Sequence, residues 1–323
     1  MRNHKLAVII PAYKADYLAA TLRSLYDQTD KRFTVYIGDD CSPYDIKSIV
    51  DQFIDKINIV YHRFDENMGS ISLTKQWERC VKLSDEEWIW LFSDDDIIEE
   101  KAVEVFYDTV EDKSLLYKFN TFIIDNKGNL NPIYRKFDPL NKLEGSISSE
   151  YFIDNRLRGN GFRSFAVEYI FHRSLFSTYG FIEFPLAWNS DDATWLRYSI
   201  ANGKKIKVLN GNVFWRLSDS NITSDTKSNV TIKQKVEATL LYTNWLAKLF
   251  ASYGLREKKE IILKWFSIQI GLFMPQTSFG GFCQLLKEIP FSFPYIMVSY
   301  YYLRHVKLQG IKRNTQRIFK RYK

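Results

Sequence analysis

Cysteine is scarce in this chain of 323 residues. The three cysteines are Cys41, Cys80 and Cys283. Their odd number and wide spacing argue against a disulfide framework or a cysteine metal site, so we expect the reduced thiols of a cytosolic protein. Long apolar runs are also missing. Lys264 interrupts residues 261–274 and Arg304 ends residues 291–303, so neither stretch reaches the ~20 residues that a membrane span needs.

Leader-like and repetitive segments are missing as well. Residues 1–5 lead directly into an apolar stretch that is too short for a signal peptide, so we expect none. No internal repeat stands out, and a hydrophobic content of 46% suffices for one large core with an appended helical segment. Much of the net charge of +7 lies in residues 312–323, without a nucleic-acid recognition motif, so we expect no nucleic-acid partner.

Acidic residues, by contrast, are concentrated at one point. Asp94, Asp95 and Asp96 directly follow the apolar residues 88–92, which predict a buried strand. Open α/β sheets bind ligands where such strands end. Adjacent carboxylates repel one another, and Mg²⁺ or Mn²⁺ with a bound diphosphate relieves that repulsion. The alternative is an acidic helix start, with the acids placed favourably for the dipole of a helix over residues 97–110.

The first hundred residues predict further strands of the same sheet. We expect strands at residues 6–10, 34–38, 57–62 and 88–92, and helices at residues 17–28 and 71–83. Successive strand–helix–strand crossovers build a parallel sheet whose loops gather along one edge. Two of these strands end in acidic turns, so we expect the two turns to lie on the same edge.

Five short motifs follow one another over roughly residues 5–220. They are Pro11-Ala12-Tyr13-Lys14, Asp39-Asp40-Cys41-Ser42, Asn67-Met68-Gly69, Asp94-Asp95-Asp96 and Asp191-Asp192. In this order they resemble the landmarks of the inverting family-two glycosyltransferases, and the order is more specific than any single motif. Lys14 departs from the family's common Asn, and the late pair is Asp-Asp in place of Glu-Asp. The resemblance implies the GT-A fold, a Rossmann-like α/β fold with a mainly parallel central sheet flanked by helices.

The resemblance also implies which residues bind a nucleoside diphosphate sugar, with a UDP-sugar as the first expectation. They are Pro11, Ala12, Tyr13, Asp39, Asp40, Asn67, Gly69, Asp94, Asp95 and Arg216. Asp40 would contact the base and ribose, since carboxylates accept hydrogen bonds from base N–H groups and ribose hydroxyls. Tyr13 would stack on the nucleotide or simply pack. Arg216 would contact phosphate or form an ordinary surface salt bridge.

The predicted cofactor is Mn²⁺ or Mg²⁺. By resemblance, Asp96 binds the ion that bridges the two phosphates, and Asp94 points towards ribose or a metal-bound water. Such an ion stabilises the negative charge that develops on the departing nucleoside diphosphate. Position 218 is a serine, so a third ligand from a histidine is not evident.

The late acidic pair carries the predicted acceptor chemistry. By resemblance, Asp192 is the general base that takes a proton from the attacking hydroxyl. A shift of one residue in the comparison would exchange the roles, so Asp191 is the alternative, and acids at a helix start are also common for dipole reasons. Trp188 and Trp195 flank the pair, where they would stack on an acceptor sugar or pack in the core.

The chain divides in character at about residue 225. We expect a catalytic domain over residues 1–225, with a donor half at 1–100 and an acceptor half at 101–225. Residues 226–323 form an aromatic and basic region that reads as helical at 230–275 and 282–310. Basic residues beside aromatics suit contact with the inner face of a membrane, and a helical cap with a solvated tail is the alternative.

Together these features predict a metal-dependent, inverting transfer of one sugar to a hydroxyl of a glycan or lipid-linked acceptor. Assembly of a bacterial surface polysaccharide is the setting that the resemblance implies. A non-catalytic protein that binds nucleotide sugars or glycans is the alternative function. A nucleotidyltransferase fits less well, because residues 11–14 do not form the glycine-rich basic loop that such enzymes carry after their first strand.

Overall fold

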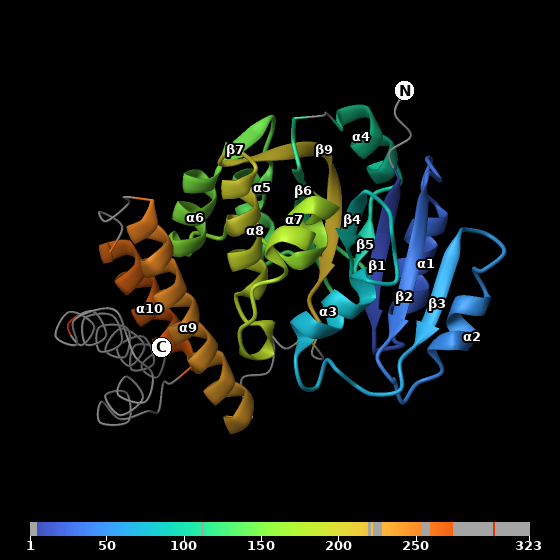
Figure 1. Cartoon of the computed structure of the whole chain (residues 1–323), viewed down its shortest axis with the longest axis horizontal. Helices are drawn as coiled ribbons and strands as arrows, with labels where there is room; N and C mark the ends of the chain where they lie inside the picture. The colour runs from blue at the N-terminus through green and yellow to red at the C-terminus, as the bar shows by residue number, and fades with distance from the viewer. Residues whose placement is uncertain are drawn as a thin grey trace, which may run out of the picture. The chain divides into compact units, whose positions relative to one another are not determined.

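The computed structural model describes residues 5–110, 113–218, 221, 228–253, 259–273 and 300. The chain, shown whole in Figure 1, divides into two compact units. The first unit comprises Met1–Arg156, Asn160–Glu183 and Ser190–Ser224. The second comprises Leu157–Gly159, Phe184–Asn189 and Asp225–Lys323.

One sheet organises the first unit. Its strands within the described residues are β1 (Leu6–Ala12), β2 (Phe33–Asp39), β3 (Ile59–Arg63), β4 (Trp88–Leu91), β5 (Ile97–Ile98), β6 (Leu116–Ile124), β7 (Ser146–Ser148), β8 (Tyr169–His172) and β9 (Lys205–Arg216). The strand order is β3-β2-β1-β4-β8-β6-β9-β5, and β7 also pairs with β9. The first four strands of this order are parallel, which confirms the sheet expected from the crossovers. Beyond them, β8 runs antiparallel to both β4 and β6.

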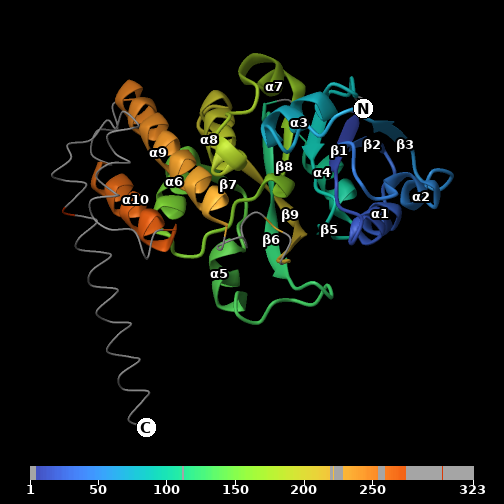
Figure 2. The ribbon, with the colours of Figure 1, turned by 90° about the horizontal axis from the view of Figure 1, so that it is seen from below.

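Helices flank the sheet. In the first unit they are α1 (Leu18–Tyr26), α2 (Ile46–Asp51), α3 (Leu73–Val81), α4 (Ala102–Thr109), α5 (Asp138–Asn141), α6 (Ser149–Arg158), α7 (Arg173–Tyr179) and α8 (Ser190–Ala201). Short 3₁₀ turns are η1 (Arg135–Phe137) and η2 (Ala166–Glu168) in the first unit and η3 (Pro185–Ala187) in the second. Helices α1 and α2 lie on one face of β1 to β3, and α3 lies on the opposite face (Figure 2).

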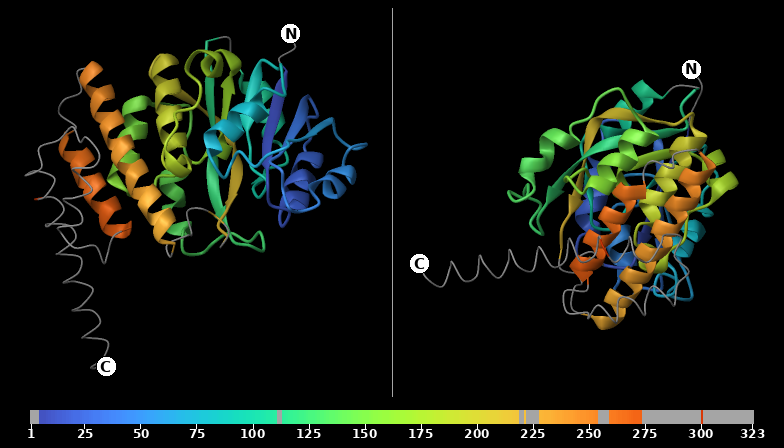
Figure 3. Two further views of the ribbon diagram at one scale, coloured as in Figure 1. Left: turned by 60° about the horizontal axis from the view of Figure 1, so that its bottom comes forward. Right: turned by 90° about the vertical axis from the view of Figure 1, so that its left-hand side faces the viewer.

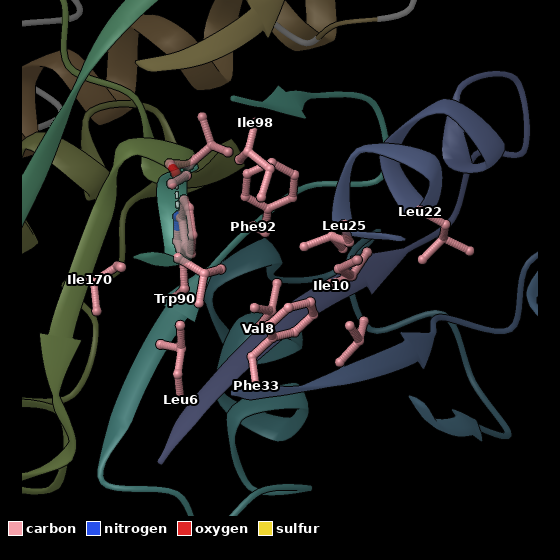
Figure 4. Packing of buried hydrophobic residues seen from close by; sticks show 14 of the residues in the cluster. Leu6, Val8, Ile10, Leu22, Leu25, Phe33, Trp90, Phe92, Ile98 and Ile170 are labelled. Carbon is pink, nitrogen blue, oxygen red and sulfur yellow. Dashed lines mark hydrogen bonds between the residues drawn. The ribbon is translucent and has the colours of Figure 1, made fainter. Parts of the chain in front are cut away.

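The centre of the sheet is packed by apolar side chains from several elements. Figure 4 shows residues of β1, α1 and the β4 region gathered in one cluster, with Trp90 at its side. Trp90 is fully buried, and its indole N–H donates to the Val167 carbonyl over 2.7 Å. Burying a large apolar side chain stabilises a fold by roughly 1.5–3 kcal/mol. The cluster therefore gives the loops at the strand ends a rigid base.

The acidic triplet does not begin a helix. Asp94, Asp95 and Asp96 are followed directly by strand β5, and α4 begins only at Ala102. The helix over residues 97–110, which the alternative explanation of the acids assumed, is therefore wrong in its first part, because β5 pairs with the distant strand β9. The alternative that the acids serve a helix dipole is wrong with it, and the carboxylates need another explanation.

The second unit contains the two helices α9 (Asn229–Ser252) and α10 (Lys259–Phe273), which lie side by side (Figure 3). They confirm the helical extension expected for residues 230–275, apart from residues 254–258 and 274–275, which are outside the described residues. The helix expected at 282–310 is also outside them, except for Tyr300. No helix in the described part of the chain has the length and apolarity needed to cross a membrane.

Candidate functional site

A pocket of about 510 Å³ lies in the first unit, at the carboxyl ends of β1, β2 and β4. In Figure 1 the chain enters β1 from the top, so these ends lie at the lower edge of the sheet. The pocket brings together eight of the residues predicted to bind the donor or the metal. They are Pro11, Tyr13, Asp40, Asn67, Gly69, Asp94, Asp95 and Asp96. Residues that are far apart in the sequence thus meet at one site.

Asp94 links the acidic turn to the turn after β1. Its Oδ2 accepts hydrogen bonds from the backbone N–H groups of Tyr13, over 2.9 Å, and Lys14, over 2.8 Å. Burial, and then the neighbouring charge of Asp95, raise the pKa of Asp94 to about 6. The two backbone donors and the Lys14 ammonium act in the opposite direction. Asp94 therefore holds the wall of the pocket in place while remaining at the pocket surface.

Asp96 is the most enclosed of the three acids. Its Oδ1 accepts from the Arg216 backbone N–H over 2.7 Å, and its Oδ2 lies 2.7 Å from the Ser93 hydroxyl. The same hydroxyl lies 2.9 Å from Asp95 Oδ1. Burial, and then the charge of Asp95, raise the pKa of Asp96 well above its usual range. The Ser93 hydroxyl has one proton, so it donates to only one of Asp95 and Asp96 at a time.

The position of Arg216 fits neither of its two predicted roles, contact with phosphate or a surface salt bridge. Its guanidinium is buried, donates to the backbone carbonyls of Asp95, over 2.7 Å, and Asp125, over 3.0 Å, and lies 4.4 Å from the centre of the Tyr17 ring. It is neither a surface salt bridge nor part of the pocket lining. We infer that Arg216 braces the acidic turn, because removing the guanidinium would leave buried carbonyls without donors.

Asp40 and Gly69 join the second and third predicted motifs. Asp40 accepts hydrogen bonds from the backbone of Met68, over 2.7 Å, and Gly69, over 2.8 Å, and forms an ion pair with Arg79. A Cβ added at Gly69 would lie 2.5 Å from Asp40 Oδ2, so only glycine permits this approach. Burial raises the pKa of Asp40, an effect that the three donors oppose.

Two residues that were predicted to bind the nucleotide sugar do not line the pocket. Asp39 is fully buried. Its Oδ2 accepts hydrogen bonds from the Tyr61 hydroxyl over 2.6 Å and from the Arg63 guanidinium over 2.8 Å, so it links β2 to β3. Ala12 is fully buried within β1. The sequence predicts that both residues contact the nucleotide directly. In the structure, however, both lie outside the pocket lining.

The acidic turn suits a divalent cation in its donor chemistry. Among the described residues, no three His, Cys, Asp or Glu side chains form a complete metal site. Mg²⁺ is commonly held by one or two carboxylates, with substrate phosphates completing its coordination. Asp94 and Asp95 fit that pattern, since a cation would relieve the repulsion that raises the pKa of Asp94. Asp96, the ligand expected from the sequence, accepts the Arg216 backbone N–H at Oδ1 and lies against the Ser93 hydroxyl at Oδ2.

The late acidic pair lies in the first turn of α8, where the two carboxylates have different surroundings. Asp192 is buried, and its Oδ2 accepts from Nε of Arg156 over 2.9 Å and from the terminal nitrogen over 2.6 Å. Asp191 is less enclosed, and its Oδ1 accepts from the Asp192 backbone N–H. Burial, and then the charge of Asp192, raise the pKa of Asp191 to about 7. The pair therefore combines a carboxylate fixed by a cation with one that titrates near neutral pH.

The two tryptophans that flank this pair in the sequence do not share one environment. Trp195 is fully buried and stacks on Tyr169 with ring centres 4.5 Å apart, so its observed role is core packing. Trp188 belongs to the second unit, where the Lys235 ammonium lies 4.8 Å from its ring centre. The predicted acceptor contact of Trp195 therefore conflicts with its burial.

Sequence reasoning missed an aromatic wall of the pocket. Phe165 and Trp215 stack with ring centres 4.3 Å apart and planes 3° apart, and both line the pocket. Phe165 directly precedes η2 and Trp215 lies in β9, so no local spacing in the sequence connects them. Close behind this wall, Glu168 forms a buried ion pair with Lys118 over 3.2 Å. The Phe165 backbone N–H donates to the same carboxylate over 3.1 Å.

A sequence profile of the family described as glycosyl transferase family 2 matches residues 7–180, more than half of the chain. The chain belongs to glycosyl transferase family 2. Glycosyltransferase GlyG of Streptococcus pneumoniae serotype 4 is 27% identical over 109 residues, which cover 33% of this chain and 36% of GlyG. The chain thus spans about a third of the length of that relative.

Solved structures agree with this family 2 assignment at the level of the fold. TarS of S. aureus (residues 1–349, with UDP-GlcNAc) has a TM-score of 0.57 and 17% identity, covering 87% of this chain and 75% of that one. The mannosyltransferase PcManGT of Pyrobaculum calidifontis, in complex with GDP-Man and Mn²⁺, has a TM-score of 0.54 and 10% identity, covering 93% and 85%. The expected GT-A fold is confirmed.

Proposed function

We propose that this family 2 protein is a metal-dependent, inverting glycosyltransferase. It transfers one sugar from a nucleoside diphosphate sugar to a hydroxyl of a glycan or lipid-linked acceptor. The observation that carries this proposal is the convergence of Asp40 and the Asp94–Asp96 turn on one pocket at the ends of parallel strands. The nucleotide sugars bound to TarS and PcManGT support a ligand of the same class here.

In this proposal each part of the pocket has a separate task. The side of the pocket around Tyr13, Asp40 and Gly69 binds the nucleoside, where Asp40 offers acceptor oxygens. Asp94 and Asp95 hold a divalent cation, and Asp96 fixes the turn on which they lie. Such a cation, when bound, offsets the negative charge of the departing diphosphate.

The late acidic pair supplies the proton acceptor. We propose Asp191 as the base, in preference to Asp192, which the family pattern suggested first. A base is most effective when its pKa is near the working pH, and burial and the charge of Asp192 raise the pKa of Asp191 to about 7. Arg156 binds Asp192 through two nitrogens, and the charge of Asp192 favours the proton on Asp191. Asp191 thus accepts the hydroxyl proton while the acceptor oxygen attacks the anomeric carbon.

The same proposal extends to the acceptor and the cellular setting. A lipid-linked acceptor would lie at an anionic membrane surface, and the basic residues of 312–323 would favour contact with that surface. Assembly of a bacterial surface polysaccharide is the setting we propose, and a cytoplasmic location with peripheral membrane contact follows from it. The basic segment lies outside the described residues.

Release of nucleotide tests the proposed function. The protein would be incubated with UDP-, GDP-, CMP- and dTDP-sugars, Mn²⁺ and a bacterial glycolipid extract, and free nucleotide would be measured. We expect one sugar nucleotide to be consumed, and chelation of the metal to stop the reaction. Tight binding of a sugar nucleotide without any release would instead support the non-catalytic binding protein.

A further inference from the structure

Lys14 is attached to the acidic turn at both ends. Its backbone N–H donates to Asp94 Oδ2 over 2.8 Å, and its Nζ lies 3.8 Å from Asp95 Oδ2. The second distance is longer than a hydrogen bond, so the ammonium is attracted to Asp95 without being fixed to it. The side chain is 29% exposed and lines the pocket. Lys14 thus has a fixed backbone and a side chain that can move within the pocket.

The charge balance of the pocket shows why this side chain matters. Among the described residues that line it, Lys14 is the single cation beside four aspartates. The guanidinium groups of two arginines near the pocket already bind other groups of the protein. Arg79 binds Asp40 and the Glu66 carbonyl, and Arg216 binds the carbonyls behind the acidic turn. Of the described lining residues, an anionic ligand that enters the pocket therefore meets one with a positively charged side chain, Lys14.

We propose that Lys14 binds the diphosphate of the donor and exchanges its contact with Asp95 for a phosphate oxygen when the donor enters. This inference rests on the proposed function. An ammonium group on a flexible stem is a compact charge with three donors, which suits an anion whose oxygens differ in position between bound states. The contact with Asp95, at 3.8 Å, is longer than a hydrogen bond, whereas a phosphate oxygen within about 2.7–3.2 Å would accept a charge-assisted hydrogen bond, so the exchange is favourable.

The same arrangement predicts how much Lys14 and a metal ion each contribute to neutralising the charge of the diphosphate. While no divalent cation is bound, Lys14 is the pocket's own counter-charge for the diphosphate. Once Mn²⁺ is present, the ion supplies most of that charge, and the loss of Lys14 becomes less important. Nucleotide binding in the presence of chelator should therefore depend on Lys14 more strongly than binding in Mn²⁺.

Calorimetry with nucleosides of increasing charge tests this inference. Uridine, UMP and UDP, and the matching guanosine series, would be titrated into the wild type, Lys14→Met and Lys14→Arg, with EDTA and with Mn²⁺. In EDTA we expect Lys14→Met to weaken diphosphate binding about tenfold, as for the loss of one such contact. Lys14→Arg should stay within about threefold of the wild type, and nucleoside binding should not change. Lys82→Met, at an exposed position after α3, is the matched control.

The outcomes separate this inference from the proposed function. If Lys14→Met binds the diphosphate as well as the wild type in EDTA, the contact does not exist. Equal losses for nucleoside and diphosphate would also overturn it, because they would indicate a damaged pocket. If the wild type binds neither UDP nor GDP even with Mn²⁺, both the inference and the proposed function are wrong.

Discussion

At the scale of single residues, Asp191 and Asp192 show how two identical side chains acquire different properties. Arg156 binds one oxygen of Asp192 through two nitrogens, whereas Asp191 accepts a backbone hydrogen bond and faces the charge of its neighbour. Burial, and then the charge of Asp192, raise the pKa of Asp191, while Arg156 and the Asp192 backbone N–H act in the opposite direction. This difference decides which residue we expect to accept the proton.

Substitution of each aspartate tests that assignment. We expect Asp191→Asn to lower the transfer rate at least about a hundredfold, as for loss of a general base, with donor binding nearly unchanged. Asp192→Asn should retain measurable transfer, because it removes a positioning charge and not the proton acceptor. Rates of nucleotide release and calorimetric donor affinity would be measured for both variants. Loss of transfer in Asp192→Asn alone would restore Asp192 as the base.

The raised pKa values also predict how stability depends on pH. Burial raises the pKa of Asp94 to about 6 and that of Asp191 to about 7, above the usual value of about 3.9. Between these values the folded protein holds more protons than the unfolded chain, so these groups lower the free energy of unfolding as pH rises. Their stabilising effect is complete below pH about 4 and lost above pH about 7.

Asp191→Asn removes one of these titrating groups. We expect its Tm to exceed that of the wild type by roughly 3 °C at pH 8, and the two Tm values to converge near pH 4. Calorimetric unfolding across this range provides the measurement. A Tm difference that is the same at both pH values would show that the carboxyl does not titrate in this window.

The sequence predicts the pocket residues better than it predicts their neighbours. Asp40, Gly69 and Asp94 were found because each belongs to a short motif at the end of an expected strand. The role of Arg216 was missed because it depends on carbonyls more than 90 residues away in the chain. The aromatic wall of Phe165 and Trp215 was missed for the same reason, since it joins two segments with no shared pattern.

At the scale of elements, the buried pair of Lys118 on β6 and Glu168 in η2 fixes the segment that carries the aromatic wall. Both side chains are fully or almost fully buried, and the Thr121 hydroxyl also donates to Glu168. Burial lowers the pKa of Lys118 and raises the pKa of Glu168, so each group depends on its partner to remain charged. Breaking such a pair on one side is costly, whereas replacing both partners is tolerated better.

Lys118→Met should therefore lower the free energy of unfolding by about 3 kcal/mol or more, because it leaves the Glu168 charge buried without its cation. The double variant Lys118→Met with Glu168→Gln should recover most of that loss, since Gln still accepts the Phe165 N–H. Urea unfolding of the wild type, both single variants and the double variant measures the coupling. Additive effects would mean that the two charges do not interact.

Local patterns predicted some elements and not others. Strands β1 to β4 and helices α1 and α3 were expected because their apolar spacing is visible within each segment. The strand β5 was read as helix, because its two residues become a strand only by pairing with β9. Helix α6 and strand β7 were also missed in a stretch rich in turn residues, where β7 is defined by its pairing with β9.

At the scale of the whole molecule, the net charge of +7 concerns association more than folding. If the basic segment reaches a membrane, deletion of residues 305–323 should release the protein from anionic vesicles and leave donor binding unchanged. Co-sedimentation with vesicles containing about one third phosphatidylserine measures this, with neutral vesicles as the control. Unchanged co-sedimentation after the deletion would discard the membrane contact.

The central claim is that the pocket at the ends of β1, β2 and β4 binds a nucleoside diphosphate sugar with a divalent cation. Calorimetric titration of UDP-, GDP-, CMP- and dTDP-sugars with Mn²⁺, with Mg²⁺ and with EDTA tests it most directly. We predict that one nucleoside diphosphate sugar binds at least about tenfold more tightly with the metal, and that Asp95→Asn removes this difference. Failure of every donor to bind under all three conditions would contradict the claim.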